Sequence, residues 1–89
     1  MRVKVEVTAQ DIRYGHRKSH ISCPIARAIQ RAIGGTPWVD PLVASVCWGK
    51  KRIQATLPKA AQHFLSLFDM IGRKAVAPLT FTANFRKEK

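Results

Sequence analysis

The spacing of the apolar residues changes along this 89-residue chain, and it limits the possible folds more than any other feature of the sequence. Residues 2–8 alternate apolar and polar side chains, with Val3, Val5 and Val7 on one side, which predicts a half-buried strand. Three further stretches alternate in the same way: residues 42–48, 52–57 and 78–85. Two other stretches repeat apolar residues every three or four positions, which predicts helices: residues 24–33 and 58–70. The predicted order is therefore β-α-β-β-α-β.

Turn and cap residues predict two short features between these elements. Thr8 and Asp11 have the spacing that caps a single helical turn, which Gly15 would end. Gly49 and Lys50 lie between two alternating stretches, and a short glycine-containing turn in that position predicts a hairpin.

We predict an α+β fold: a two-layer sandwich in which two helices cover one face of a mainly antiparallel sheet. A ferredoxin-like arrangement is one possible topology for this order of elements. Residues 1–85 are expected to form a single domain, and residues 86–89 a basic C-terminal tail. Residues 36–41 are expected to be an irregular connection that Trp38 anchors.

The charge of the chain indicates an anionic partner. The sequence has 16 Lys and Arg against 5 Asp and Glu, a formal net charge of +11 with the histidines neutral. Solubility alone needs a charge of only about 2–8 in a small domain. No apolar stretch has the roughly 18 residues of a membrane span, the first residues do not form a signal peptide, and the 2 cysteines suit a reducing compartment. We therefore expect a cytoplasmic protein with no membrane partner.

The predicted anion-binding residues come from three places. One is the polar loop at residues 15–22 with the adjacent Arg13. It precedes the helix start at Cys23 and Pro24, and residues 16–23 are a candidate phosphate or carboxylate site because free N–H groups at a helix start attract anions. The others are the exposed face of that helix and the turn of the predicted hairpin. The predicted set comprises Arg13, His16, Arg17, Lys18, His20, Arg27, Arg31, Lys50, Lys51 and Arg52.

Three other kinds of site fit the sequence less well. An RNA-recognition motif needs aromatic residues on its central strands, and residues 2–8 and 51–57 contain none. A cysteine phosphatase loop needs an arginine six positions after Cys23, where this chain has Ile29. A zinc set of His16, His20 and Cys23, with Cys47 or His63 as the fourth ligand, matches no familiar spacing and stays open. We predict no catalytic residue, metal or cofactor.

The sequence resembles a group of small proteins encoded by bacteriophages and prophages. The resemblance lies in DIRYG at residues 11–15, CPIARAIQRA at residues 23–32 and the later residues Leu57-Pro58, Phe64 and Phe68-Asp69. Proteins of that group often carry another cysteine three residues before the equivalent of Cys23, where this chain has His20. The resemblance implies a small phage-type accessory protein in the cytoplasm of a host cell, and it implies no particular activity.

These observations favour a non-enzymatic nucleic-acid-binding accessory protein that contacts the phosphate backbone with little sequence specificity. The alternative is a phage-type inhibitor that binds an acidic or nucleic-acid-binding surface of a host protein complex. Trp38, Trp48 or Tyr14 would then serve as its anchor. A small ribosome-associated protein is a third hypothesis. The sequence leaves open whether the partner is DNA, RNA or protein, and it does not indicate the oligomeric state.

Overall fold

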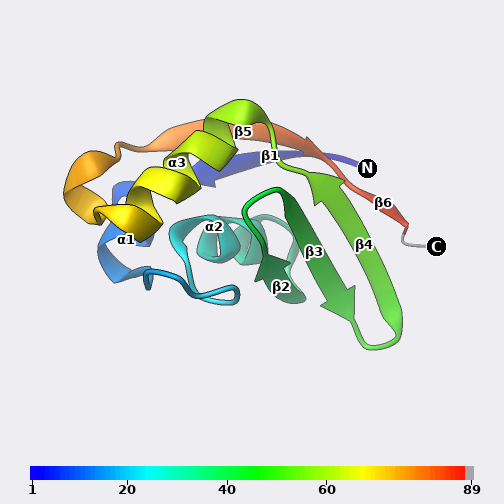
Figure 1. The fold of residues 1–89 in the computed structure, drawn as a ribbon. Helices are drawn as coiled ribbons and strands as arrows, with labels where there is room; N and C mark the ends of the chain where they lie inside the picture. Colours follow the sequence, from blue (N-terminus) through cyan, green and yellow to red (C-terminus); the bar gives the residue numbers. More distant parts are fainter. Residues whose placement is uncertain (88–89) are drawn as a thin grey trace.

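The computed structural model describes residues 1–87, and these residues form an α+β fold (Figure 1). The strands are β1 (Arg2–Val7), β2 (Thr36–Val39), β3 (Val43–Trp48), β4 (Lys51–Thr56), β5 (Leu79–Asn84) and β6 (Arg86–Lys87). The helices are α1 (Ala9–Tyr14), α2 (Pro24–Ile33) and α3 (Lys59–Met70), with a 3₁₀ turn, η1 (Arg73–Ala75). The predicted order of the four long strands and two long helices is confirmed.

The last part of the chain connects two antiparallel sheets. β5 pairs with β1, with Val5 opposite Phe81, and β6 pairs with β4, with Gln54 opposite Arg86. β4 also pairs with β3, and β3 with β2, so the larger sheet has the order β2-β3-β4-β6. Within the described residues β1 pairs only with β5. This differs from a ferredoxin-like arrangement, in which the first strand is central.

The apolar faces predicted from the sequence meet in one core. Val3, Val5 and Val7 are buried on the inner side of β1, and the apolar residues of β5 face the same core. α2 packs against β1 and β2 and lies inside the curve of the two sheets (Figure 1). α3 packs against β5 and η1 through its own buried residues: Ala61, Phe64, Leu65 and Phe68.

Two segments differ from the prediction. Residues 36–41 were expected to be irregular, but Thr36–Val39 form β2 and pair with β3. Pro37 and Val39 of this strand face the core, so Trp38 points outward and is 45% exposed rather than anchored. Arg86 and Lys87, expected at the start of the C-terminal tail, form β6. The remaining tail residues, 88–89, lie outside the described residues.

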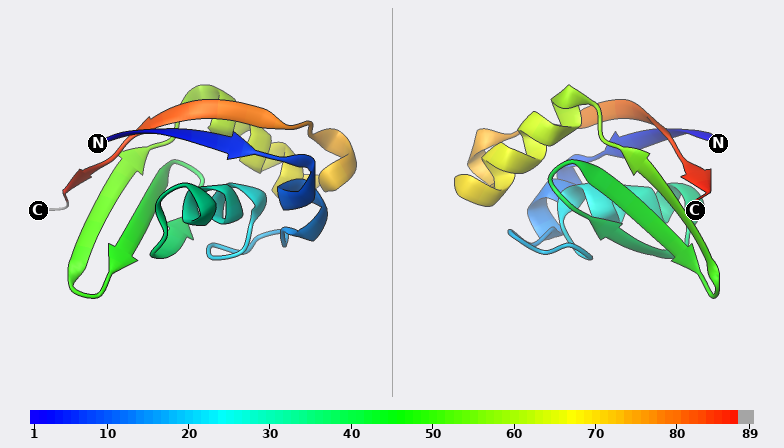
Figure 2. Two further views of the ribbon diagram at one scale, coloured as in Figure 1. Left: turned by 180° about the vertical axis from the view of Figure 1, so that it is seen from behind. Right: turned by 45° about the vertical axis from the view of Figure 1, so that its right-hand side comes forward.

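The hairpin of β3 and β4 projects from the rest of the protein. Its turn lies at one end of the long axis and the segment around η1 lies at the other, in every view (Figures 1 and 2). The Cα atoms extend 36 Å along this axis. Within residues 1–87, no helix has the length and apolar composition needed to cross a membrane.

Candidate nucleic-acid interface

The turn of the hairpin and the adjacent strand β6 form a basic surface, which we call the hairpin end. It contains three of the predicted residues and two that were assigned to the tail: Lys50, Lys51, Arg52, Arg86 and Lys87. Pairing of β6 with β4 brings the two groups together, because Lys87 lies opposite Ile53 and Arg86 opposite Gln54. β3, β4 and β6 contain no acidic residue.

The strand register distributes these cations around the hairpin end. Gln54 and Arg86 are opposite one another on the outer face of the sheet, and Arg52 lies on the same face two residues away. Diagonal neighbours of this kind are about 7–8 Å apart in an antiparallel pair. Lys51 is on the opposite face of β4, the same face as the buried Ile53. It lies past the edge of the core and is exposed. Cations therefore surround the end of the ribbon rather than one side of it.

The tip of the hairpin is open. Gly49 has a φ of +58°, which glycine adopts without strain, and no atom lies within 4 Å of the position its Cβ would take. None of the large hydrophobic side chains that are exposed in residues 1–87 belongs to β3, β4 or β6. The hairpin end is thus a projecting surface with basic and polar side chains.

The predicted anion site before α2 has a different geometry. The first turn of α2 is buried, since Cys23, Pro24, Ile25 and Ala26 are all inaccessible to solvent. The Sγ of Cys23 already accepts a hydrogen bond from the Ala26 N–H at 3.4 Å. An anion in solution has no access to these N–H groups, so the expected arrangement, with loop cations around an open helix start, is wrong.

Arg17 and Lys18 instead contact the C-terminal end of a different helix, α3. The Arg17 guanidinium donates to the carbonyl of Asp69 at 3.0 and 3.2 Å and to that of Met70 at 2.8 Å. The backbone N–H of Lys18 donates to the Asp69 carboxylate at 2.9 Å, and Lys18 has a φ of +57°. The carbonyl end of a helix is partly negative, so these contacts fasten the loop to the C-terminus of α3.

Of the two predicted histidines of this loop, His20 contacts β2 and the residue that follows it. His20 stacks on Trp38 with 4.6 Å between ring centres, and its Nδ1 lies 2.9 Å from the Val39 carbonyl and 3.2 Å from the Asp40 carboxylate. His16 is exposed. Within residues 1–87, no three His, Cys, Asp or Glu side chains form a group that could hold a metal ion.

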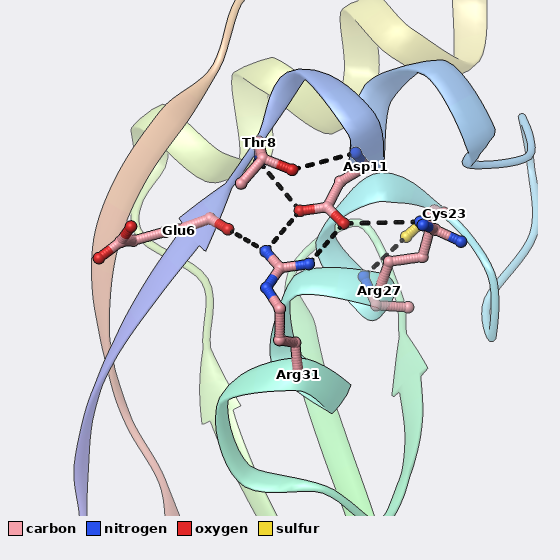
Figure 3. A network of polar contacts seen from close by, with 7 residues as sticks. Glu6, Thr8, Asp11, Cys23, Arg27 and Arg31 are labelled. Atoms are coloured by element: carbon pink, nitrogen blue, oxygen red, sulfur yellow. Dashed lines mark hydrogen bonds and ion pairs between the residues drawn. The ribbon is translucent and has the colours of Figure 1, made fainter.

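Arg27 and Arg31 of α2 surround a buried carboxylate, as Figure 3 shows. Asp11 is 0% exposed, and Arg31 donates to both of its oxygens at 2.7 and 2.8 Å and to the carbonyl of Glu6 at 2.6 Å. The Nε of Arg27 lies 3.5 Å from the same carboxylate. Both arginines were predicted as phosphate contacts on an exposed helix face. The structure instead engages them within the fold, and we call this group the Asp11 cluster.

Hydrogen bonds determine the charge state of Asp11. Burial alone would raise the pKa of this carboxyl, but the donors from Arg31 and the backbone N–H of Thr8 outweigh it and lower the pKa below 3.8. Thr8 and Asp11 also form the predicted capping box of α1, with the Thr8 N–H donating to Asp11 at 2.9 Å. The hydrogen bonds between Arg31 and Asp11 also raise the pKa of Arg31.

Cys23, the other candidate at this helix start, is a buried cap. Burial raises the pKa of its thiol to about 11, so the group is protonated at neutral pH.

Arg13 and Arg17 lie around the same hollow as two cations that were not among the predicted site residues, Arg73 and Lys74. Together with Arg73 and Lys74 they line a hollow of about 300 Å³, which we call the basic hollow. Its other lining residues are Ile12, Gly15, Phe68, Ile71 and Gly72. The sequence shows Arg73 and Lys74 as a basic pair, but only the fold brings them to residues more than fifty positions away.

The acidic residues among residues 1–87 have partners outside the hairpin end. Glu6 pairs with Lys4, Asp40 with His20, Asp11 with the arginines of α2, and Asp69 with the Lys18 N–H. All of these contacts lie outside β3, β4 and β6.

No family model, curated protein or solved structure matches this chain. The resemblance to bacteriophage proteins stays a prediction, and the function has to be inferred from the geometry.

Proposed function

We propose that the protein binds the phosphate backbone of double-stranded nucleic acid through its hairpin end. The observation that carries this proposal is the gathering of Lys50, Lys51, Arg52, Arg86 and Lys87 on a projecting two-stranded ribbon and its neighbouring strand, none of whose described residues is acidic. A two-stranded ribbon has the size that enters the major groove of DNA. Cations on both faces of such a ribbon are able to contact the phosphates on either side.

The side chains of the hairpin end favour a duplex over a single strand. Proteins that bind single strands stack bases on exposed aromatic rings. The hairpin end has no such ring, because Trp48 is partly buried against the core. Recognition of a particular base sequence needs side chains held in place to bond base edges. The hairpin end offers mainly flexible lysine and arginine side chains, so we expect binding to be largely independent of the base sequence.

Salt dependence measures the number of phosphates contacted. If the five cations of the hairpin end each neutralise one phosphate, the logarithm of the binding constant falls with the logarithm of the salt concentration with a slope of about −4.5. Fluorescence anisotropy with a labelled DNA duplex at several salt concentrations gives this slope. A duplex of RNA and a single strand of the same length test the kind of nucleic acid, and we expect the single strand to bind more weakly.

Two charge-reversed variants locate the binding surface. Lys50→Glu with Lys51→Glu should reduce the slope to about −2.7 or abolish binding. Arg73→Glu with Lys74→Glu changes the net charge by the same amount at the opposite end of the protein, and it should leave the slope unchanged. An equal effect of both pairs would show that only net charge matters and would overturn the proposal. So would a lack of duplex binding at low salt.

A further inference from the structure

The basic hollow combines features that the hairpin end lacks. Four cations line it, and its floor is made by apolar side chains that belong to the core, Ile12 and Phe68. Ile71 lines it as well and is 62% exposed, while the adjacent Met70 is 74% exposed. Tyr14, next to Arg13, is also exposed. Positive charge and uncovered apolar surface therefore lie together at this end of the protein.

Contacts within the fold fix the shape of the hollow. The hydrogen bonds of Arg17 to the end of α3 hold its guanidinium in place, and its Cδ lies 3.9 Å from the position of a Cβ on Gly72. Gly72 has a φ of +116°, which side-chain-bearing residues rarely adopt. A Cβ on Gly15 would approach the Asp11 carbonyl and Pro24 to 2.7 Å. Glycine is thus required at both positions, and one wall of the hollow is preformed.

We infer that the basic hollow binds an acidic protein segment that carries an apolar side chain. Charge complementarity is the first reason: four cations line the hollow, and no Asp or Glu among residues 1–87 does so. The second reason is the apolar floor and the exposed Ile71, which a phosphate backbone would leave uncovered. A volume of about 300 Å³ holds one or two side chains, and it is too small for a nucleic-acid duplex.

This inference is independent of the nucleic-acid proposal, because the two surfaces lie at opposite ends of the molecule (Figures 1 and 2). It gives the protein a second type of partner, a protein with an acidic and partly apolar strand or tail. One chain then has the means to hold a nucleic acid at one end and an acidic protein at the other.

Fluorescence anisotropy with labelled peptides tests the inference. The probe is a peptide of about ten residues, rich in Glu, with one central Leu, and the comparison peptide has Ser in place of Leu. We expect the Leu peptide to bind about tenfold more tightly, because the hollow covers its apolar side chain. Arg73→Glu with Lys74→Glu should abolish binding of both peptides, and Lys50→Glu with Lys51→Glu should leave both unchanged.

The variant Ile71→Ser separates the apolar contribution from the charge. Ile71 is exposed, so its replacement should have little effect on folding. In this variant the preference for the Leu peptide should shrink, because Ile12 and Phe68 remain but Ile71 is lost, while the affinity of the Ser peptide stays the same. Equal binding of the two peptides by the unaltered protein would overturn the inference. It would also be overturned if Arg73→Glu with Lys74→Glu removed duplex binding, because the hollow would then belong to the nucleic-acid surface.

Discussion

Both the Asp11 cluster and the hairpin end contain solvent-exposed cations, but the charges around them differ. Arg31 has a side chain that is 50% exposed, yet it donates to both oxygens of a buried carboxylate. Arg86 and Lys51 lie on strands that have no acidic residue, and Lys50 lies in the turn between two such strands. The first group neutralises a charge inside the protein, and the second group lies on the exposed surface.

The difference shows that exposure alone does not identify a binding cation. A buried carboxylate has lost its hydration and needs donors, so the arginines near Asp11 contribute to folding. A cation without such a partner contributes little to folding and is available for phosphates. Stability and binding should therefore respond to different substitutions, and three predictions test this separation.

The largest loss of stability is expected for Arg31→Ala. Removing Arg31 takes two hydrogen bonds from a buried carboxylate and should lower the free energy of unfolding by about 3 kcal/mol. For a domain of this size that corresponds to a fall of about 15 °C in Tm. Duplex binding well below the Tm should persist. Arg86→Ala is the matched control, with a stability change under about 0.5 kcal/mol and a salt slope weaker by about one.

If Arg31→Ala and Arg86→Ala changed stability and duplex binding to the same extent, the distinction between the Asp11 cluster and the hairpin end would be wrong. Urea unfolding and duplex anisotropy on both proteins measure stability and binding separately. A stable Arg31→Ala protein that no longer binds DNA would place Arg31 in the interface.

A smaller loss, about 2 kcal/mol at neutral pH, is expected for Asp11→Asn, because the arginines released from the carboxylate can reach water. The pKa of Asp11 is lowered by folding, so its ionised form stabilises the protein above pH 3.8, and this contribution disappears as the pH falls further. The difference in stability between the natural protein and Asp11→Asn should therefore shrink on acidification. Urea unfolding at about pH 7 and at about pH 2–3 measures it, and a constant difference would contradict the role given to Asp11.

The smallest of the three effects is expected for Arg17→Ala. This substitution removes the donors to the carbonyls of Asp69 and Met70 and should cost about 1 kcal/mol, since the contacts are exposed. His16→Ala, in the same loop, should leave the Tm unchanged. A natural-like Tm in both variants would mean that Arg17 is not held by the end of α3.

Most of the fold could be predicted from local sequence patterns. α2 and α3 follow from their apolar spacing, and the capping box of α1 follows from two residues three positions apart. β2 did not follow, because it has only four residues and contains Pro37, which is rare inside a sheet. β6 did not follow either, because Lys87 stands where the alternation of β5 would next place an apolar residue, and β6 pairs with β4 of the other sheet.

The candidate sites were less predictable, because they depend on contacts between distant residues. Asp11 and Arg31 are twenty positions apart, and nothing local to α2 indicates that its arginines face a carboxylate. The hollow joins α1 to the residues that follow α3. The hairpin cations were found from sequence because a turn and its flanking strands are a local unit.

The pairing of β1 with β5 has a consequence for how the chain folds. β1 is made before the other described strands, but within the described residues its one strand partner is separated from it by more than seventy positions. The hairpin and α2 can form early from local contacts, whereas the smaller sheet has to wait until residues 79–84 have been made. Because β5 is followed directly by β6, the same segment completes both sheets, and the core should close only once residues 79–87 are present.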